Sequence, residues 1–135
     1  MPTVVNGGRA QRGYGSPMAT VWGLHNDHPE LGLVENGFVS ISWEDLGDLR
    51  RLGPDREAFK AALERHYPRA KPGAYPVMAG VLRRFVYEMA VGDLVIYPHK
   101  PDSTLSFGRV TGDYRFDADA PTHHNRRDVQ WLRTT

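Results

Sequence analysis

The sequence contains no cysteine among its 135 residues. This absence excludes disulfide bonds, thiol nucleophiles, iron–sulfur clusters and zinc sites with cysteine ligands. The sequence also has no apolar run near the roughly 20 residues of a membrane-spanning helix, and residues 1–17 lack the apolar stretch of a secretory signal. We therefore expect a cytoplasmic protein that contacts no membrane.

A strong charge of either sign is missing as well. The chain has 17 basic and 16 acidic residues, a formal net charge of +1. Residues 1–17 hold two basic and no acidic residues, residues 18–98 hold nine and eleven, and residues 99–135 hold six and five. Bulk positive charge therefore does not explain binding to nucleic acid, and any such contact has to come from a local patch.

The motifs of common catalytic sites are also absent. No G-x-G-x-x-G or G-x-x-x-x-G-K-[ST] run stands at a strand-to-helix junction, and neither a serine nucleophile elbow nor a nuclease constellation can be assembled. The carboxylates at residues 44, 45, 48, 117 and 119 lie in polar, turn-like surroundings typical of turns and helix starts. We expect no catalysis by this chain alone and no cofactor.

Six histidines raise the question of a metal site. His25 and His28 are close in sequence, and His123 and His124 are adjacent. Neither group forms the helical i, i+4 pair of metalloproteases, and adjacent residues on a strand point to opposite faces. We therefore expect no metal site.

Hydrophobic residues make up 40% of the chain, and their spacing predicts the secondary structure. Gly53-Pro54-Asp55 opens a helix that Tyr67-Pro68 ends, and an apolar stripe predicts a second helix over residues 72–89. Strands are expected at residues 20–25, 37–43, 94–98, 104–116 with a break at residue 112, and 129–132. We expect residues 1–17, which are rich in glycine, to form a flexible arm before one domain of residues 18–135.

This order of elements predicts the fold class. Two strands are followed by two helices and then by three or four strands, and the connections are too short for repeated right-handed crossovers. We therefore expect an α+β fold built on a mostly antiparallel, barrel-like β-sheet with two flanking helices.

Two tryptophans are the best candidates for ligand binding, although most aromatic residues are simply core. Trp22 and Trp43 lie in the first two expected strands, and Trp43 ends its strand beside the polar residues 44–48. If the two strands are neighbours, the indoles can form walls on which a base stacks after leaving its helix. Polar groups for the edge of that base are nearby at His25, Asn26 and Ser42.

Contacts to the nucleic-acid backbone are expected from cations in the later part of the chain. The candidates are Lys100, Arg115, Arg126 and Arg127. A solvated surface of balanced charge is the alternative for each of them, because Asp102, Asp117, Asp119 and Asp128 lie among them.

Four blocks of the sequence resemble the N-terminal domain of Mrr-like restriction system proteins. They are residues 38–49 (FVSISWEDLGDL), 84–98 (RFVYEMAVGDLVIYP), 107–116 (FGRVTGDYRF) and 124–134 (HNRRDVQWLRT). The resemblance covers residues 18–134 in the right order. It implies a PUA-like domain related to EVE and YTH modules, which are small barrels that hold a nucleobase in an aromatic-edged cleft.

The resemblance further implies a non-catalytic reader of modified bases in DNA, which targets a nuclease domain in the same or a separate chain as in type IV restriction. In the family the last block continues into a nuclease domain, whereas this sequence ends at Thr135. The arm before Met18 is also outside the pattern, and His25 stands where relatives often carry Arg. Base flipping into an aromatic pocket is the implied mechanism, and the kind of modification and the oligomeric state stay open.

Two alternatives compete with a DNA reader. PUA-like modules such as ASCH domains also bind RNA or free nucleotides. A protein-interaction module is the other alternative, with either the stripe of Leu82, Phe85 and Met89 or the exposed aromatic residues as its contact surface.

Overall fold

The computed structural model describes residues 4–10, 19–26, 28–99 and 101–135. The strands are β1 (Val4–Ala10), β2 (Ala19–His25), β3 (Phe38–Ile41), β4 (Leu94–His99), β5 (Thr104–Val110), β6 (Arg115–Phe116) and β7 (Asn125–Thr134). The helices are α1 (Leu33–Asn36), α2 (Arg56–His66) and α3 (Ala74–Arg83). Short 3-10 turns η1 (Pro29–Leu31), η2 (Glu44–Leu46) and η3 (Leu49–Leu52) and a π-helical turn η4 (Arg84–Glu88) complete the described elements.

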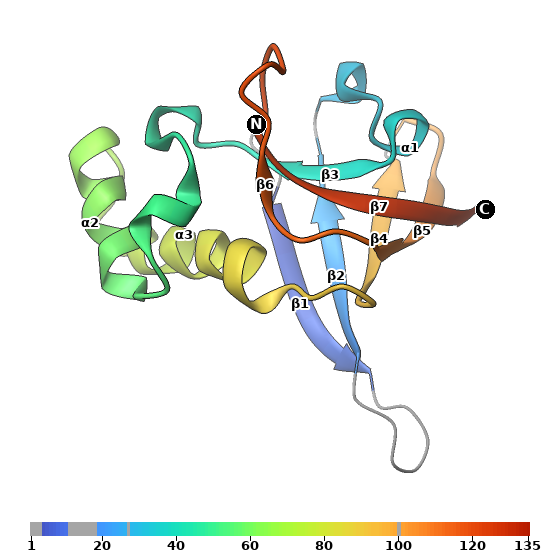
Figure 1. The fold of residues 1–135 in the computed structure, drawn as a ribbon, viewed down its shortest axis with the longest axis horizontal. Coiled ribbons are helices and arrows are strands. Elements are labelled where there is room, and N and C mark those ends of the chain that lie inside the picture. The colour runs from blue at the N-terminus through green and yellow to red at the C-terminus, as the bar shows by residue number, and fades with distance from the viewer. Residues whose placement is uncertain (1–3, 11–18, 27, 100) are drawn as a thin grey trace.

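The strands form one curled, mixed sheet that makes a half-barrel, with α2 and α3 grouped at one side of it (Figure 1). The strand order is β1-β2-β4-β5-β7-β3, and β6 pairs with β7. β2 and β4 run parallel, whereas the other described pairs are antiparallel. The predicted α+β class and the mostly antiparallel sheet are therefore confirmed.

The predicted strands agree with the structure apart from their ends. The run 104–116 divides into β5 and β6 as predicted, and the last strand is longer than its apolar run because charged residues 126–128 belong to it. One correction concerns the expected arm. Residues 4–10 form strand β1 and pair antiparallel with β2, so this part of residues 1–17 has regular structure.

Helix α2 begins and ends where its sequence predicts. The Asp55 carboxylate accepts a hydrogen bond from the N–H of Glu57 at 3.0 Å and so caps the helix. Phe59 and Leu63 are fully buried on the inner face. The N–H of Tyr67 donates to the carbonyl of Leu63, after which the backbone leaves the helical region.

The second predicted helix is α3 followed by the π-helical turn η4. Tyr75, Leu82, Phe85 and Met89 of its stripe are buried against the sheet core. Because these side chains are covered, the stripe is part of the core and presents no contact surface to another protein. The structure therefore corrects the interaction surface considered for Leu82, Phe85 and Met89.

Asp93 connects the start of β4 to β2. Its carboxylate accepts hydrogen bonds from Trp22 Nε1 at 2.9 Å, from Ala90 N at 2.9 Å and from Thr20 N at 3.2 Å. Asp93 is itself buried, so these bonds provide the partners that a buried carboxylate requires. Within the described residues, no helix combines the length and the apolar character needed to cross a membrane.

Candidate functional site

Trp22, which was predicted as one wall of a base site, lies in the core. It is only 3% exposed, and its indole N–H is bound to Asp93. In the sheet, β4, β5 and β7 separate its strand β2 from β3, so strand pairing does not place Trp22 beside Trp43. A covered ring has no free face for a base, and we therefore correct the assignment of Trp22: it is a core residue.

Trp43 has a different environment at the end of β3. It is half-buried and packs against the edge of the core, and it begins the turn η2 with a left-handed backbone angle φ of 63°. A bulky residue in this region is strained by about 1 to 3 kcal/mol, and such strain is concentrated at functional sites.

His123 is a second residue with a left-handed backbone, at φ 51°. Its loop precedes β7 and is held by the Arg126 guanidinium, which donates to the carbonyls of His123 at 2.8 Å and Thr122 at 3.2 Å. The next residue, His124, donates from Nδ1 to Oε2 of Glu44. This bond joins the His123 loop to the residue directly after Trp43, so two strained segments meet at one place.

Two hydrogen-bonding atoms at this meeting point have no partner. Of the four buried, unpaired side-chain atoms in the described residues, Oε1 of Glu44 and Nε2 of His123 belong here. Native proteins leave few buried polar atoms unpaired, and each unpaired atom needs a reason such as a ligand contact. Burial, together with the nearby His28, lowers the pKa of the His123 imidazole and favours its neutral form.

The loop after β2 borders this cluster. The rings of His28 and His123 lie 4.8 Å apart between centroids, and Nδ1 of His28 is 3.1 Å from Oε1 of Glu30. Asn26 holds the loop, because its Oδ1 accepts from His28 N at 3.0 Å and its Nδ2 donates to the carbonyl of His28 at 3.1 Å and to Tyr97 Oη at 3.3 Å. Hereafter Trp43, Glu44, His123, His124 and His28 are called the η2 cluster.

The other predicted base contacts differ in their relation to the η2 cluster. Asn26 borders it through His28, and Ser42 is half-buried directly before Trp43. His25 is half-buried at the end of β2. Asn26 therefore borders the η2 cluster through His28 and Ser42 directly precedes Trp43, whereas Trp22 is covered in the core.

The predicted backbone contacts are mostly engaged within the protein. Arg127 is 3% exposed and donates to the carbonyls of Phe85 at 3.0 Å and Val86 at 2.9 Å, so its prediction as a phosphate contact is wrong. Arg126 holds the His123 loop. Arg115 pairs with Asp128 at 3.0 Å and with Asp117 at 3.4 Å. Lys100 lies outside the described residues.

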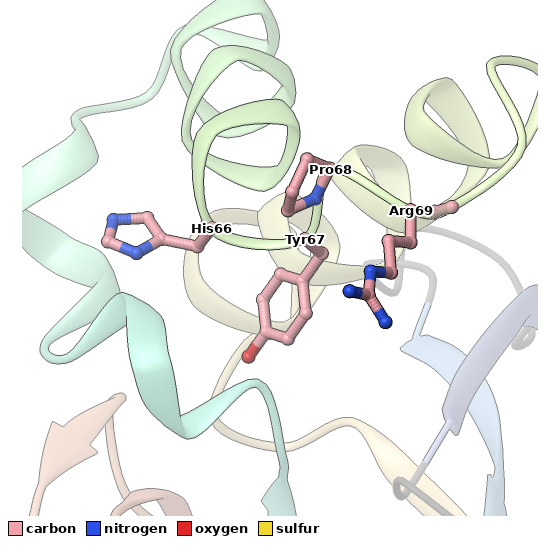
Figure 2. A pocket seen from close by; sticks show the side chains of 5 residues that line it. His66, Tyr67, Pro68 and Arg69 are labelled. Carbon is pink, nitrogen blue, oxygen red and sulfur yellow. The ribbon is translucent and has the colours of Figure 1, made fainter.

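A pocket of about 450 Å³ opens at the end of α2. It is lined by His66, Tyr67, Pro68, Arg69 and Ala70. Figure 2 shows the Tyr67 ring between the side chains of His66 and Arg69. Burial raises the pKa of the Tyr67 hydroxyl, and the charge of Asp45 in η2 acts in the same direction.

Comparison with protein families gives a match over most of the chain. The profile of a domain of unknown function, DUF8426, matches residues 24–135. The chain belongs to the DUF8426 family. This match covers every element from the end of β2 to β7, and therefore the whole η2 cluster. Neither the curated proteins nor the solved structures contain a significant match to the chain.

Of the η2 cluster, sequence reasoning predicted only Trp43 as a site residue and missed Glu44, His28, His123 and His124. The polar surroundings of Glu44 indicate only a turn or a helix start, and these histidines are considered only as metal ligands, which their spacing does not support. The contact between Glu44 and His124 joins residues 80 positions apart in the sequence, and no local sequence pattern predicts it. In the described residues, no group of three or more His, Asp or Glu side chains is arranged to hold a metal ion.

Proposed function

We propose that this DUF8426 domain reads a modified base in DNA at the η2 cluster, without catalysing a reaction. The base leaves its helix and stacks on Trp43, while Glu44 and His123 bind its polar edge. The sequence alone predicts stacking between Trp22 and Trp43. In this proposal the base stacks on Trp43 alone, and the polar groups come from Glu44 and His123. The observation that carries it is the meeting of two strained segments around two unpaired buried atoms.

The free energies of base flipping, stacking and hydrogen bonding indicate why the polar side chains Glu44 and His123 matter for binding. Flipping a base out of a duplex costs a few kcal/mol, and stacking on one aromatic ring returns about 1 to 3 kcal/mol. Stacking alone therefore roughly cancels the cost. A hydrogen bond to a charged group contributes about 1.5 to 3 kcal/mol, so a bond to the free Oε1 of Glu44 shifts the balance toward binding.

The identity of these atoms suggests the class of base. A carboxylate only accepts hydrogen bonds, and an exocyclic amino group, such as N4 of cytosine, is its usual donor on a base. Cytosine and adenine both carry such a group, and their 5-methyl, 5-hydroxymethyl and N6-methyl forms keep at least one N–H. We therefore propose a modified cytosine or adenine as the ligand.

The site has to open when the base enters. Oε1 of Glu44 and Nε2 of His123 are buried, although the Glu44 side chain as a whole is 32% exposed. Rotamer changes of interface side chains are common on binding, and a rotamer change of Glu44 would uncover these atoms. The strained backbone on both sides makes this region the natural place for that change.

We further propose that the half-barrel is a PUA-like domain of a type IV, Mrr-like restriction system. The four sequence blocks quoted above support this, and the half-barrel with helices at one side is compatible with it. Block 38–49 supplies Trp43 and Glu44, and block 124–134 supplies His124. Under this proposal the cleavage of DNA belongs to a nuclease domain in cis or in trans, in the cytoplasm.

The experiment is a titration of the protein with matched duplexes by fluorescence anisotropy. The duplexes differ only at one base, which is cytosine, 5-methylcytosine, 5-hydroxymethylcytosine, adenine or N6-methyladenine. We expect one modified duplex to bind more tightly than its unmodified partner at every salt concentration. Equal affinity for all duplexes would overturn the proposal, and tighter binding of single-stranded RNA or of mononucleotides would favour the alternative PUA-like function.

A further inference from the structure

A second pocket lies between α2 and α3, away from the η2 cluster. Its volume is about 300 Å³, and it is lined by Arg56, Gly80, Arg83, Arg84 and Glu88. Arg56 is the first residue of α2, whereas the other residues come from α3 and η4. Three guanidinium groups and one carboxylate therefore face one small cavity.

Gly80 allows these guanidinium groups to approach one another. A Cβ atom on Gly80 would stand 2.6 Å from Nη2 of Arg56 and 3.1 Å from Nη1 of Arg84. The two cationic groups, from different helices, thus occupy the space that a side chain at position 80 would fill. Gly80 lies inside a helix, where glycine costs about 1 kcal/mol relative to alanine, so its presence requires a reason such as this packing.

The positive charges in this pocket are poorly compensated by the protein. Arg83 uses its guanidinium to bind Glu88 at 3.1 Å and the carbonyl of Pro54 at 2.7 Å. Arg56 donates to the carbonyl of Pro76 at 3.2 Å. In the described part of the chain, no carboxylate pairs with Arg56 or Arg84. Two like charges therefore stay close together with no counter-charge of their own.

We propose that this pocket binds a phosphoryl group, with its oxygens held by Arg56 and Arg84. Guanidinium groups match phosphate oxygens in geometry and bind them by paired, charge-assisted hydrogen bonds. The absence of a side chain at Gly80 lets these two guanidinium groups approach each other, and Arg83 is held beside them by Glu88 and the carbonyl of Pro54. Hereafter the five lining residues are called the arginine pocket.

The phosphoryl group has two sources with the same chemistry. One is the sugar–phosphate backbone of a nucleic acid, and the other is free phosphate or the phosphate of a nucleotide. The proposal does not depend on base reading at the η2 cluster, because its residues and its readout are different. The arginine pocket is the kind of local positive patch that a chain of net charge +1 needs for binding to nucleic acid.

The test uses four single variants of the full chain. R56A and R84A remove one guanidinium each, G80A places a methyl group against both of them, and E88Q removes the negative charge. R65A serves as the matched control, because Arg65 is an exposed arginine of α2 that does not line the pocket. Thermal unfolding of each variant is measured to check that the fold is kept.

The first arm measures binding of a short unmodified duplex as a function of salt. We expect R84A and R56A to weaken binding roughly tenfold and to lower the slope of log K against log salt by about one, whereas R65A leaves the slope nearly unchanged. The second arm follows the binding of inorganic phosphate by NMR chemical shifts of the α2 and α3 amides. There we expect loss of binding in R84A and tighter binding in E88Q.

The outcomes distinguish backbone phosphate from free phosphate, and they distinguish failure of the phosphoryl site from failure of base reading at the η2 cluster. A response in the duplex arm assigns the backbone phosphate as the source, and a response confined to the phosphate arm assigns the free anion. If R56A, R84A and G80A bind both probes as tightly as the wild type does, the arginine pocket is no phosphoryl site and the proposal fails. Preference for a modified base is a separate measurement, so either proposal can fail while the other stands.

Discussion

The indole Nε1 of Trp22 donates a hydrogen bond to Oδ2 of Asp93 across 71 residues of sequence. This bond fixes the parallel pair β2–β4, in which Trp22 is aligned with Val95. It also explains why an aromatic residue with the features of a base-stacking wall is a core residue instead. The indole N–H needs a buried partner, and Asp93 provides it.

Replacement of Asp93 by Ala should destabilise the domain strongly. The variant leaves the N–H groups of Thr20, Trp22 and Ala90 without their acceptor, and each buried unpaired donor costs about 1 to 3 kcal/mol. We expect the free energy of unfolding in urea to fall by about 3 kcal/mol or more. D119A, at an exposed carboxylate, is the control, and a loss in D93A no larger than in D119A would contradict this account.

Arg127 should act on stability and not on DNA binding. Its guanidinium binds the carbonyls of Phe85, Val86 and Gly112, and burial lowers its pKa. We expect R127M to lose about 2 to 4 kcal/mol of unfolding free energy, since three carbonyls lose their donor. The salt dependence of duplex binding should stay as in the wild type. If a folded R127M protein showed a smaller slope of log K for duplex binding against log salt than the wild type, Arg127 would be a phosphate contact and this account would be wrong.

Gly108 should tolerate no side chain. It lies at the irregularity of the β5–β7 pairing, and a Cβ atom there would stand 2.6 Å from Cγ1 of Val129 and 2.8 Å from Cε3 of Trp131. Overpacking of this kind costs about 1 to 3 kcal/mol, so G108A should lower the midpoint of thermal unfolding. G73A is the control, because a Cβ there meets nothing within 4 Å and its φ is not left-handed. Equal midpoints of thermal unfolding for G108A and G73A would contradict this prediction, because they would mean that β5 and β7 move apart enough to accept the added methyl group.

His123 should make stability depend on pH. Burial lowers its pKa in the folded state, so below the ordinary pKa the unfolded state binds more protons than the folded state does. The contribution of His123 to the free energy of unfolding is complete above a pH of about 6.5, and this contribution is lost as the pH falls through the lowered pKa of the folded state. Glu44 and Glu30 oppose the shift, whereas His28 and Arg126 strengthen it.

The measurement is urea unfolding of the wild type and of H123N between neutral and mildly acidic pH. We expect the wild type to lose more stability than H123N on acidification, since asparagine does not titrate and accepts the left-handed backbone. Parallel curves for the two proteins would mean that His123 does not contribute to this pH dependence.

Local signals in the sequence predicted most elements correctly. Asp55 and Tyr67 mark the two ends of α2 by capping chemistry, which acts within a few residues. The strand runs were equally clear, because alternation and turn residues are local. Even η1 and α1 have a visible signal, since Gly32 and Gly37 end them with left-handed backbones.

The arrangement of these elements was not predictable in the same way. Strand order decides whether Trp22 lies beside Trp43, and it depends on pairings between distant segments such as β3 with β7. Burial of Arg127 likewise follows from where β7 crosses the end of η4. For the candidate site, the sequence indicated Trp43, but its polar partners come together only through the bond between Glu44 and His124.

The central claim is that Trp43 stacks a modified base beside Glu44 and His123. Its most direct test is the ratio of affinities for a modified and an unmodified duplex, measured for the wild type, W43F, W43A and the control Y87A, which removes an exposed aromatic ring of η4. We predict that W43A loses about 1 to 3 kcal/mol of this preference and W43F keeps most of it, while Y87A matches the wild type. An unchanged ratio in a folded W43A protein would contradict the account.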